Sequence, residues 1–325
     1  MKIQEELTSW FRKNHRDLPF RKNKDPYSIW VSEIMAQQTR IETMIPYYER
    51  WMNDYPTILD LSNAPIEKVL KSWEGLGYYN RARKLHEGAI QVVNDYNGQL
   101  PSSLDELLKI KGIGPYTAGA IASIAFNQKA PAIDGNVLRV TTRLLEIEDD
   151  ISKQKTVKKV YDIVYDFMDD NYSDFTEGLM ELGALICTPL NPKCDECPLN
   201  KKCMSYKNNT QENYPIKTKA KKNPILSFKT LIIIQDNKIL LSRDDRDGLM
   251  KDFYRLPQYE TIDTNRYEFI KQSKHIYSHK TWSMDVYKYI DGTIPNDEYL
   301  VWVNLDEMDQ LPMIGAHLKI IKKCK

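Results

Sequence analysis

Four of the five cysteines in this 325-residue chain lie within one stretch of seventeen residues. Because that stretch is polar and rich in proline, we interpret the four as a metal site rather than as thiols packed in a core. The spacing C-x6-C-x2-C-x5-C could close a tetrahedral zinc site or supply one thiolate to each iron of a [4Fe-4S] cluster, and it leaves both open. The four residues are Cys187, Cys194, Cys197 and Cys203, whereas Cys324 stands apart near the end of the chain.

A Gly-x-Gly turn, Gly112-Ile-Gly114, separates two segments that have helical patterns. The first, 104–110, places leucine and isoleucine at helical spacing, and the second, 115–120, is rich in small residues. Glycine lets a backbone approach a phosphate closely, and the amide groups that open the second helix favour negative charge. The pattern predicts contact with a nucleic-acid backbone that does not depend on base sequence, with a tight helix–helix turn as the alternative.

The composition sets limits on these interpretations. Hydrophobic residues make up 42% and charged residues 28% of the chain, as in an ordinary soluble protein, and the formal net charge is only +1. Nucleic-acid contact would therefore depend on local basic patches. The sequence contains no apolar run long enough to span a membrane and starts with polar residues, so we expect a cytosolic protein without a targeting segment.

The length predicts about two domains of ordinary size. Up to about residue 206 the patterns are helical, with a helix expected over 157–167 and no alternating strand. A lysine-rich linker is expected over 207–225, and an α+β domain over 226–325. In that second domain we expect strands at 228–234, 238–242 and 282–290 and helices at 266–272 and 316–322.

Three motifs together resemble a known family. The Gly112–Gly114 turn, the segment Ala132-Ile-Asp134-Gly-Asn-Val-Leu-Arg139 and the cysteine loop 187–203 occur in the order found in helix-hairpin-helix DNA glycosylases with an iron–sulfur cluster. Within that superfamily, Trp30-Val-Ser-Glu-Ile-Met-Ala-Gln-Gln-Thr39 and Trp73-Glu-Gly-Leu-Gly-Tyr-Tyr79 resemble the A/G-specific adenine DNA glycosylases of the MutY type. The resemblance implies an all-α helix-hairpin-helix region over 1–206 with a [4Fe-4S] loop, followed by a Nudix-like domain over 226–325.

The resemblance also implies base-excision repair, in which an adenine mispaired with 8-oxoguanine, or less well with guanine, is flipped out of duplex DNA and cut from its sugar. Cutting an N-glycosidic bond passes through a sugar cation, so the reaction needs an acid for the base and a negative group for the sugar. Glu33 matches the acid, and its pKa should be raised by desolvation. Asp134 matches the ionised group that stabilises the cation, and Asn136 is expected to orient the sugar or a water molecule.

Tyr116 stands where related glycosylases that also cut the strand have a lysine that forms a Schiff base. We therefore expect a monofunctional enzyme that leaves an abasic site. A glycosylase and lyase acting on oxidised pyrimidines is a rival within the superfamily. A non-catalytic DNA-binding or redox-sensing iron–sulfur protein is a rival of another class.

Further contacts follow from the resemblance alone. Gln38, Leu76 and Tyr78 match positions that enter the duplex around 8-oxoguanine, with apolar core as the alternative for the last two. The adenine pocket matches Arg16, Phe20, Arg21 and Glu177, where Phe20 replaces the more usual tryptophan and Ala36 is smaller than the expected leucine.

Tyr277, Ser278 and His279 of the second domain match a loop that recognises 8-oxoguanine, since a hydroxyl and an imidazole can bond its N7–H and O8 edge. The glutamate-rich helix that binds magnesium in Nudix hydrolases is not visible in the sequence. We expect the protein to bind double-stranded DNA with A·8-oxoguanine or A·G mispairs as a monomer, near the nucleoid if it is bacterial.

Overall fold

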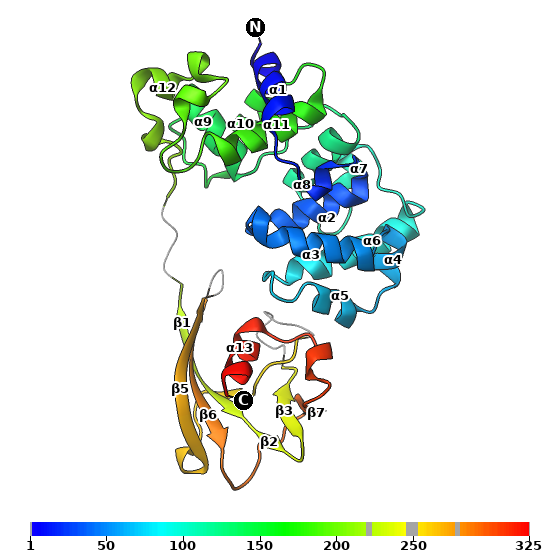
Figure 1. The fold of residues 1–325 in the computed structure, drawn as a ribbon, viewed down its shortest axis with the longest axis vertical. Helices are drawn as coiled ribbons and strands as arrows, with labels where there is room; N and C mark the ends of the chain where they lie inside the picture. Colours follow the sequence, from blue (N-terminus) through cyan, green and yellow to red (C-terminus); the bar gives the residue numbers. More distant parts are fainter. Residues whose placement is uncertain (1, 219–222, 245–252, 277–279, 325) are drawn as a thin grey trace. The chain divides into compact units, whose positions relative to one another are not determined.

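A computed structural model describes residues 2–218, 223–244, 253–276 and 280–324 (Figure 1). Its backbone contacts divide the chain into two compact units. The first, here the helical unit, combines Met1–Asn63 with Lys84–Lys219, and the second, the sheet unit, combines Ala64–Arg83 with Ala220–Lys325. No helix in the described ranges is both long enough and apolar enough to span a membrane.

Residues 2–218 form helices and turns, and this described range contains no strand, which confirms the helical prediction. The predicted helix over 157–167 lies within α10. The helices are α1 (Ile3–Asn14), α2 (Pro26–Ala36), α3 (Ile41–Asp54), α4 (Ile58–Asn63), α5 (Ile66–Ser72), α6 (Asn80–Asp95), α7 (Leu104–Leu107), α8 (Pro115–Ala120), α9 (Gly135–Leu145), α10 (Gln154–Phe167), α11 (Tyr172–Leu185) and α12 (Met204–Asn208).

Side-chain hydrogen bonds fix the residues at which helices α2, α9 and α11 begin. Asp25 accepts the Ser28 N–H, and Pro26 follows it at the first position of α2. Asp134 accepts the Val137 N–H at 2.7 Å and thereby caps α9. Asn171 caps α11 by accepting the Asp174 N–H. Asp134 is thus held by the same bond that starts its helix.

The core of the helical unit lies where α11 packs against α1 and α9. Leu7, Val137, Val160 and Phe175 are fully buried there. A Cβ added at Gly183 would lie 2.5 Å from the Asn136 Cβ, so α11 and the start of α9 touch through a glycine. This close packing places the polar residues of α11 beside those of α9.

The Gly-x-Gly turn connects α7 to α8, and a single π-helical turn, Ile121–Ala125, continues α8. Gly112 has φ +83°, and an added Cβ would lie 2.9 Å from the Lys84 Cβ and 3.0 Å from the Lys84 carbonyl oxygen. Gly114 has φ −95°, and an added Cβ would meet no atom within 4 Å. Conformation and space therefore require glycine at 112, whereas Gly114 leaves open space beside the helix start.

Two sheets form the sheet unit. One has the strand order β4-β1-β6-β5, in which β1 is parallel to β6 and the other pairs are antiparallel, and the second has the order β2-β3-β7. The strands are β1 (Ile225–Ile232), β2 (Ile234–Gln235), β3 (Lys238–Ser242), β4 (Gln258–Tyr259), β5 (Tyr267–Ile276), β6 (Thr281–Tyr289) and β7 (Leu300–Asn304). Helix α13 (Gly315–Cys324) packs on β6 through the edge contact of His317 with Trp282, whose ring centroids are 5.8 Å apart.

The strand predictions at 228–234, 238–242 and 282–290 are confirmed, and so is the last helix. The hairpin turn at Asp236 and Asn237 has positive φ at both residues, which suits a two-residue turn. The helix predicted over 266–272 is wrong, because this segment belongs to strand β5. β5 pairs antiparallel with β6, the next strand along the chain, over most of its length, so cross-strand pairing and not helical spacing decides its structure.

Residues 64–83 contact the C-terminal part of the sheet unit. The Lys71 ammonium donates to the Leu311 carbonyl oxygen at 3.1 Å, and the Met313 N–H donates to a Glu74 carboxylate oxygen at 3.1 Å. The rings of Tyr79 and Phe253 lie 4.2 Å apart. A segment from the first quarter of the chain therefore packs with residues that follow the predicted linker.

Candidate active site

Three elements bring Glu33, Tyr116 and Asp134 together. Glu33 lies on α2, Tyr116 in the first turn of α8, and Asp134 at the cap of α9. The Tyr116 hydroxyl donates a hydrogen bond to Glu33 Oε2. Burial raises the pKa of the Tyr116 phenol well above its usual value, so the phenol stays neutral and serves as a donor.

Glu33 has the pKa expected of a general acid. Although part of its side chain reaches solvent, desolvation by the surrounding protein raises its pKa to about 7, and the nearby charges of Asp134 and Glu177 act in the same direction. The bond from Tyr116 and the charge of Arg21 oppose the rise. A carboxyl that titrates near neutral pH can both hold and release a proton.

Asp134 receives two donors that favour its ionised form. Oδ1 accepts the Val137 N–H and Oδ2 accepts the Asn136 amide at 2.7 Å. Burial raises the pKa of Asp134, and these bonds oppose that rise. The side-chain oxygen Oδ1 of Asn136 accepts from Arg139 at 2.9 Å, and Arg139 also donates to the backbone carbonyl oxygens of Gly183 and Cys187. The amide of Asn136 is therefore occupied in orienting Asp134.

Charged side chains cluster beside Glu33. Arg21 forms an ion pair with Glu177 at 3.2 Å, and both side chains are 13% exposed. Burial raises the pKa of Glu177, and Arg21 opposes this. Arg16 and Arg21 both bond to Glu181, a residue of α11 that our sequence analysis missed. Glu181 lies four residues after Glu177, and that helical spacing is the signal that could have indicated it.

Phe20 lies in the short helix Pro19–Arg21 that also contains Arg21, and its ring meets Tyr48 edge-on with centroids 5.7 Å apart. The predicted adenine-pocket residues from this helix therefore sit on one turn of backbone.

The residues predicted to enter the duplex differ in exposure. Gln38 follows α2 with φ +56° and is exposed. In the sheet unit, Leu76 is 7% exposed, whereas Tyr78 has φ +48° and is 43% exposed. The Arg81 guanidinium lies 5.4 Å from the centre of the Tyr78 ring. Tyr78 is thus displayed at the surface, and Leu76 is packed.

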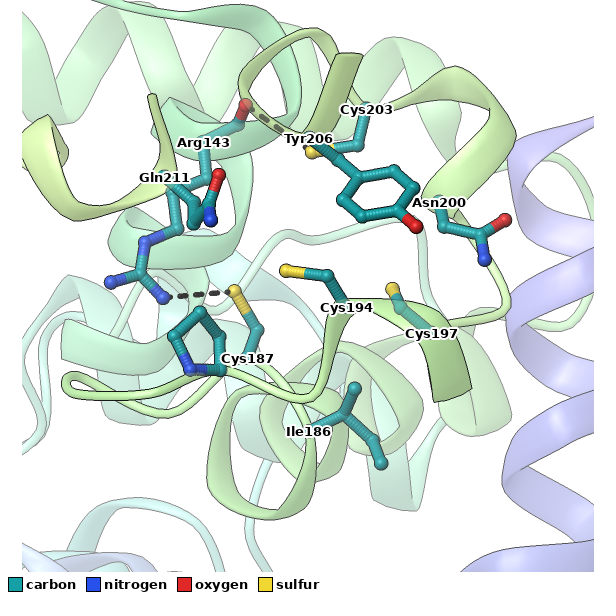
Figure 2. A pocket seen from close by; sticks show the side chains of 10 residues that line it. Arg143, Ile186, Cys187, Cys194, Cys197, Asn200, Cys203, Tyr206 and Gln211 are labelled. Atoms are coloured by element: carbon teal, nitrogen blue, oxygen red, sulfur yellow. Dashed lines mark hydrogen bonds between the residues drawn. The ribbon is translucent and has the colours of Figure 1, made fainter. Parts of the chain in front are cut away.

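Figure 2 shows the four clustered cysteines around a common cavity, which Tyr206, Gln211 and Arg143 also line. Among the described residues no group of three His, Cys, Asp or Glu side chains is arranged to hold a single metal ion. Burial raises the pKa of Cys197 to about 12 and also raises those of Cys194 and Cys203. Thiols in such surroundings ionise when a metal replaces their protons.

Arg143 fastens this loop from α9. It is 2% exposed and donates to the Thr188 and Pro189 carbonyl oxygens at 2.7 and 3.0 Å and to Cys187 Sγ at 3.5 Å. The Gln211 side-chain oxygen is buried in the described structure without a hydrogen-bond partner. The donor set and this polar atom fit a cavity that holds an inorganic group.

The proposed 8-oxoguanine contacts Tyr277, Ser278 and His279 lie outside the described residues. So do Lys219, Lys221 and Lys222 of the predicted linker.

The sequence and the fold match known proteins. Residues 31–164 match the HhH-GPD superfamily base excision DNA repair proteins, and residues 229–323 match the NUDIX domain. Adenine DNA glycosylase from Buchnera aphidicola subsp. Acyrthosiphon pisum is 31% identical over 98% of this chain and 96% of its own length. The human adenine DNA glycosylase is 41% identical over 63% of this chain and 40% of its own length.

Among solved structures, a thermostable thymine-DNA glycosylase matches with a TM-score of 0.57 and 29% identity, over 63% of this chain and 94% of that protein. A non-covalent endonuclease III–DNA complex matches with a TM-score of 0.54 and 25% identity, over 64% and 95%. Together with the family matches over residues 31–164 and 229–323, these structures confirm a helix-hairpin-helix glycosylase region followed by a Nudix-like domain. The chain belongs to the adenine DNA glycosylases of the MutY type, within the HhH-GPD superfamily of base excision DNA repair proteins.

Proposed function

We propose that this protein excises adenine mispaired with 8-oxoguanine, and less efficiently with guanine, from double-stranded DNA. The arrangement of Glu33 beside Asp134 supports this proposal most directly, because it pairs an acid of pKa about 7 with a carboxylate held by the N–H of Val137. Among members of an adenine DNA glycosylase family, these two groups are suited to the two charges that develop as the base leaves.

The chemistry follows from what each group can do. Glu33 gives its proton to adenine N7, which turns the base into a neutral leaving group as the bond from N9 to the sugar breaks. Asp134, ionised by the Val137 and Asn136 donors, stabilises the sugar cation. Ionised Glu33 then accepts a proton from the water that adds to the sugar carbon, so the enzyme returns to its starting state. Tyr116 holds Glu33 throughout and offers no amine, so the product is an abasic site in an intact strand.

We further propose that Cys187, Cys194, Cys197 and Cys203 hold a [4Fe-4S] cluster. A space ringed by four thiols suits a cluster in which each iron takes one cysteine ligand. When bound, the cluster would link the four cysteines of the loop 187–203 to one another, while Arg143 of α9 donates to Cys187 Sγ at 3.5 Å. Iron, sulfide and zinc analysis of the purified protein tests this. Stoichiometric zinc without sulfide would contradict the cluster.

A cleavage assay tests the function. Duplexes that carry A opposite 8-oxoguanine, G, T or C are incubated with the protein and then treated with alkali, which cuts at abasic sites. We expect cleavage fastest opposite 8-oxoguanine, slower opposite G, and only after alkali. Strand cuts without alkali together with a borohydride-trapped adduct would instead support a lyase.

The sheet unit is proposed to recognise the opposing 8-oxoguanine through Tyr277, Ser278 and His279. Replacing Ser278 and His279 with alanine should reduce the preference for 8-oxoguanine over G while excision from A·G continues. An unchanged preference would show that these residues do not recognise 8-oxoguanine.

A further inference from the structure

Glu181 is a buried carboxylate whose bonds all go to arginines of the adenine pocket. It lies on α11, one helical turn after Glu177, and its side chain is 1% exposed. Its Oε1 accepts the Arg16 backbone N–H and Nε–H, both at 2.9 Å. Its Oε2 accepts Arg16 Nη2 at 2.8 Å and Arg21 Nη2 at 2.9 Å.

The Glu181 carboxylate is ionised at neutral pH. Burial alone would raise its pKa, but the hydrogen bonds from Arg16 and Arg21 outweigh burial and bring the pKa of Glu181 to about 2. A buried carboxylate can stay ionised only while its cationic partners remain in contact with it. The four bonds therefore bind Glu181 and the two guanidinium groups into one rigid unit.

Arg21 is shared between two carboxylates. One nitrogen, Nη2, bonds to Glu181, while Nε pairs with Glu177 at 3.2 Å. The remaining nitrogen, Nη1, donates to the Arg16 carbonyl oxygen at 3.4 Å. Glu181 thus prevents Arg21 from turning both ends of its guanidinium toward Glu177.

The position of Arg21 matters for the acid. The groups that act on Glu33 are Tyr116 from α8, Asp134 at the start of α9, Glu177 from α11, and Arg21 from the short helix before α2. Glu181 bonds to Arg21, and the charge of Arg21 lowers the pKa of Glu33, so Arg21 connects Glu181 to the acid.

We propose that Glu181 is a positioning residue that holds Arg16 and Arg21 at the adenine pocket and keeps Arg21 divided between Glu177 and itself. The proposal rests on the pocket and on the excision reaction proposed above. It assigns no contact between Glu181 and DNA.

The test is E181Q, which keeps the shape but presents a donor to arginine donors. We expect single-turnover excision from an A·8-oxoguanine duplex, at saturating enzyme, to fall about 10- to 100-fold, the scale of a misplacement near 1 Å. We also expect the alkaline limb of the pH–rate profile, where Glu33 loses its proton, to move to lower pH. The reason is that the positive charge of Arg21 is then less fully neutralised near Glu33.

The matched control is D174N, which removes a carboxylate from the same helix. Asp174 pairs with Arg12 of α1 at 2.6 Å and also accepts from Asn171, so its described bonds do not involve Arg16 or Arg21. D174N should keep both the rate and the position of the limb. E181D, which keeps the charge on a shorter side chain, should be slower than wild type but keep its limb, and it provides the test if E181Q does not fold.

The outcomes separate the proposals. A wild-type rate in E181Q, or in E181D if that variant stands in for it, would overturn the positioning role. A slower E181Q whose limb stays in place would overturn it too, because it would assign Glu181 to stability alone. If the wild-type protein itself releases no adenine, the proposed function fails instead.

Discussion

The helical unit and the sheet unit each bury a titratable side chain, and the two side chains differ in charge state. In the helical unit, Glu181 is buried in its ionised form between arginines, and Glu33 is held where its pKa is about 7. In the sheet unit, His317 is fully buried, and burial lowers its pKa to about 3, so it is neutral. Its Nδ1 accepts the Leu256 N–H at 3.0 Å. Groups that can change or share charge cluster around the proposed chemistry, whereas the buried histidine serves the fold.

The largest expected effect tests the role of Glu33 in the helical unit. E33Q keeps the size of the side chain and removes the proton donor. We expect excision from A·8-oxoguanine to fall by about 10²- to 10⁴-fold, the usual contribution of a general acid, with duplex binding retained. Single-turnover cleavage and binding to the same duplex measure the two quantities. Equal losses in both would show that Glu33 supports the structure and not the reaction.

Stability at acid pH tests the role of His317 in the sheet unit. The folded-state pKa of His317 lies below its ordinary value of 6.5, so below that pH the unfolded chain binds a proton that the folded sheet unit does not. As pH falls from 7 to 4, protonation of the unfolded chain should cost the sheet unit ~3 kcal/mol of stability. Glu33 has the opposite sign, because its folded-state pKa is raised, and it penalises the folded helical unit as pH rises through about 7.

Hydrogen exchange measured by mass spectrometry, corrected for the intrinsic effect of pH, resolves the two units. Between pH 7 and 5 we expect protection to fall in β6 and α13 but not in α2 and α9. H317Q should be less stable at pH 7 and should lose less on acidification. A sheet unit as stable at pH 4 as at pH 7 would contradict the inference that His317 is buried in its neutral form.

The two glycines of the turn allow fold and DNA contact to be separated within the helical unit. G112A places a side chain at φ +83° and against Lys84, so we expect ~1–3 kcal/mol of destabilisation, seen as a lower Tm. G114A meets open space and should change Tm little. If this turn approaches phosphate, G114A should still weaken duplex binding. Wild-type binding by G114A would leave the turn as a helix–helix connection.

Local patterns predicted much of the fold, whereas Glu33 and Asp134 were identified through the family resemblance. The helix over 157–167 and the strands at 228–234 and 238–242 depend on neighbours in sequence, and the structure contains them. Segment 266–272 was predicted wrongly because its structure depends on pairing with β6, the next strand along the chain, and not on its own residue spacing. Glu181, the second carboxylate that binds the two arginines, was missed because it meets Arg16 across 165 residues.

The smallest expected effect concerns Tyr116, whose hydroxyl bonds to Glu33. The bond from the Tyr116 hydroxyl lowers the pKa of Glu33 and thus opposes burial. Y116F removes that bond without adding charge, so the pKa of Glu33 should rise and the alkaline limb should move to higher pH, opposite to E181Q. The rate below the limb should change less than about 10-fold, because one neutral donor contributes about 1 kcal/mol. A limb that moves to lower pH would mean that Tyr116 does not favour the ionised form of Glu33, and the electrostatic account of this acid would fail.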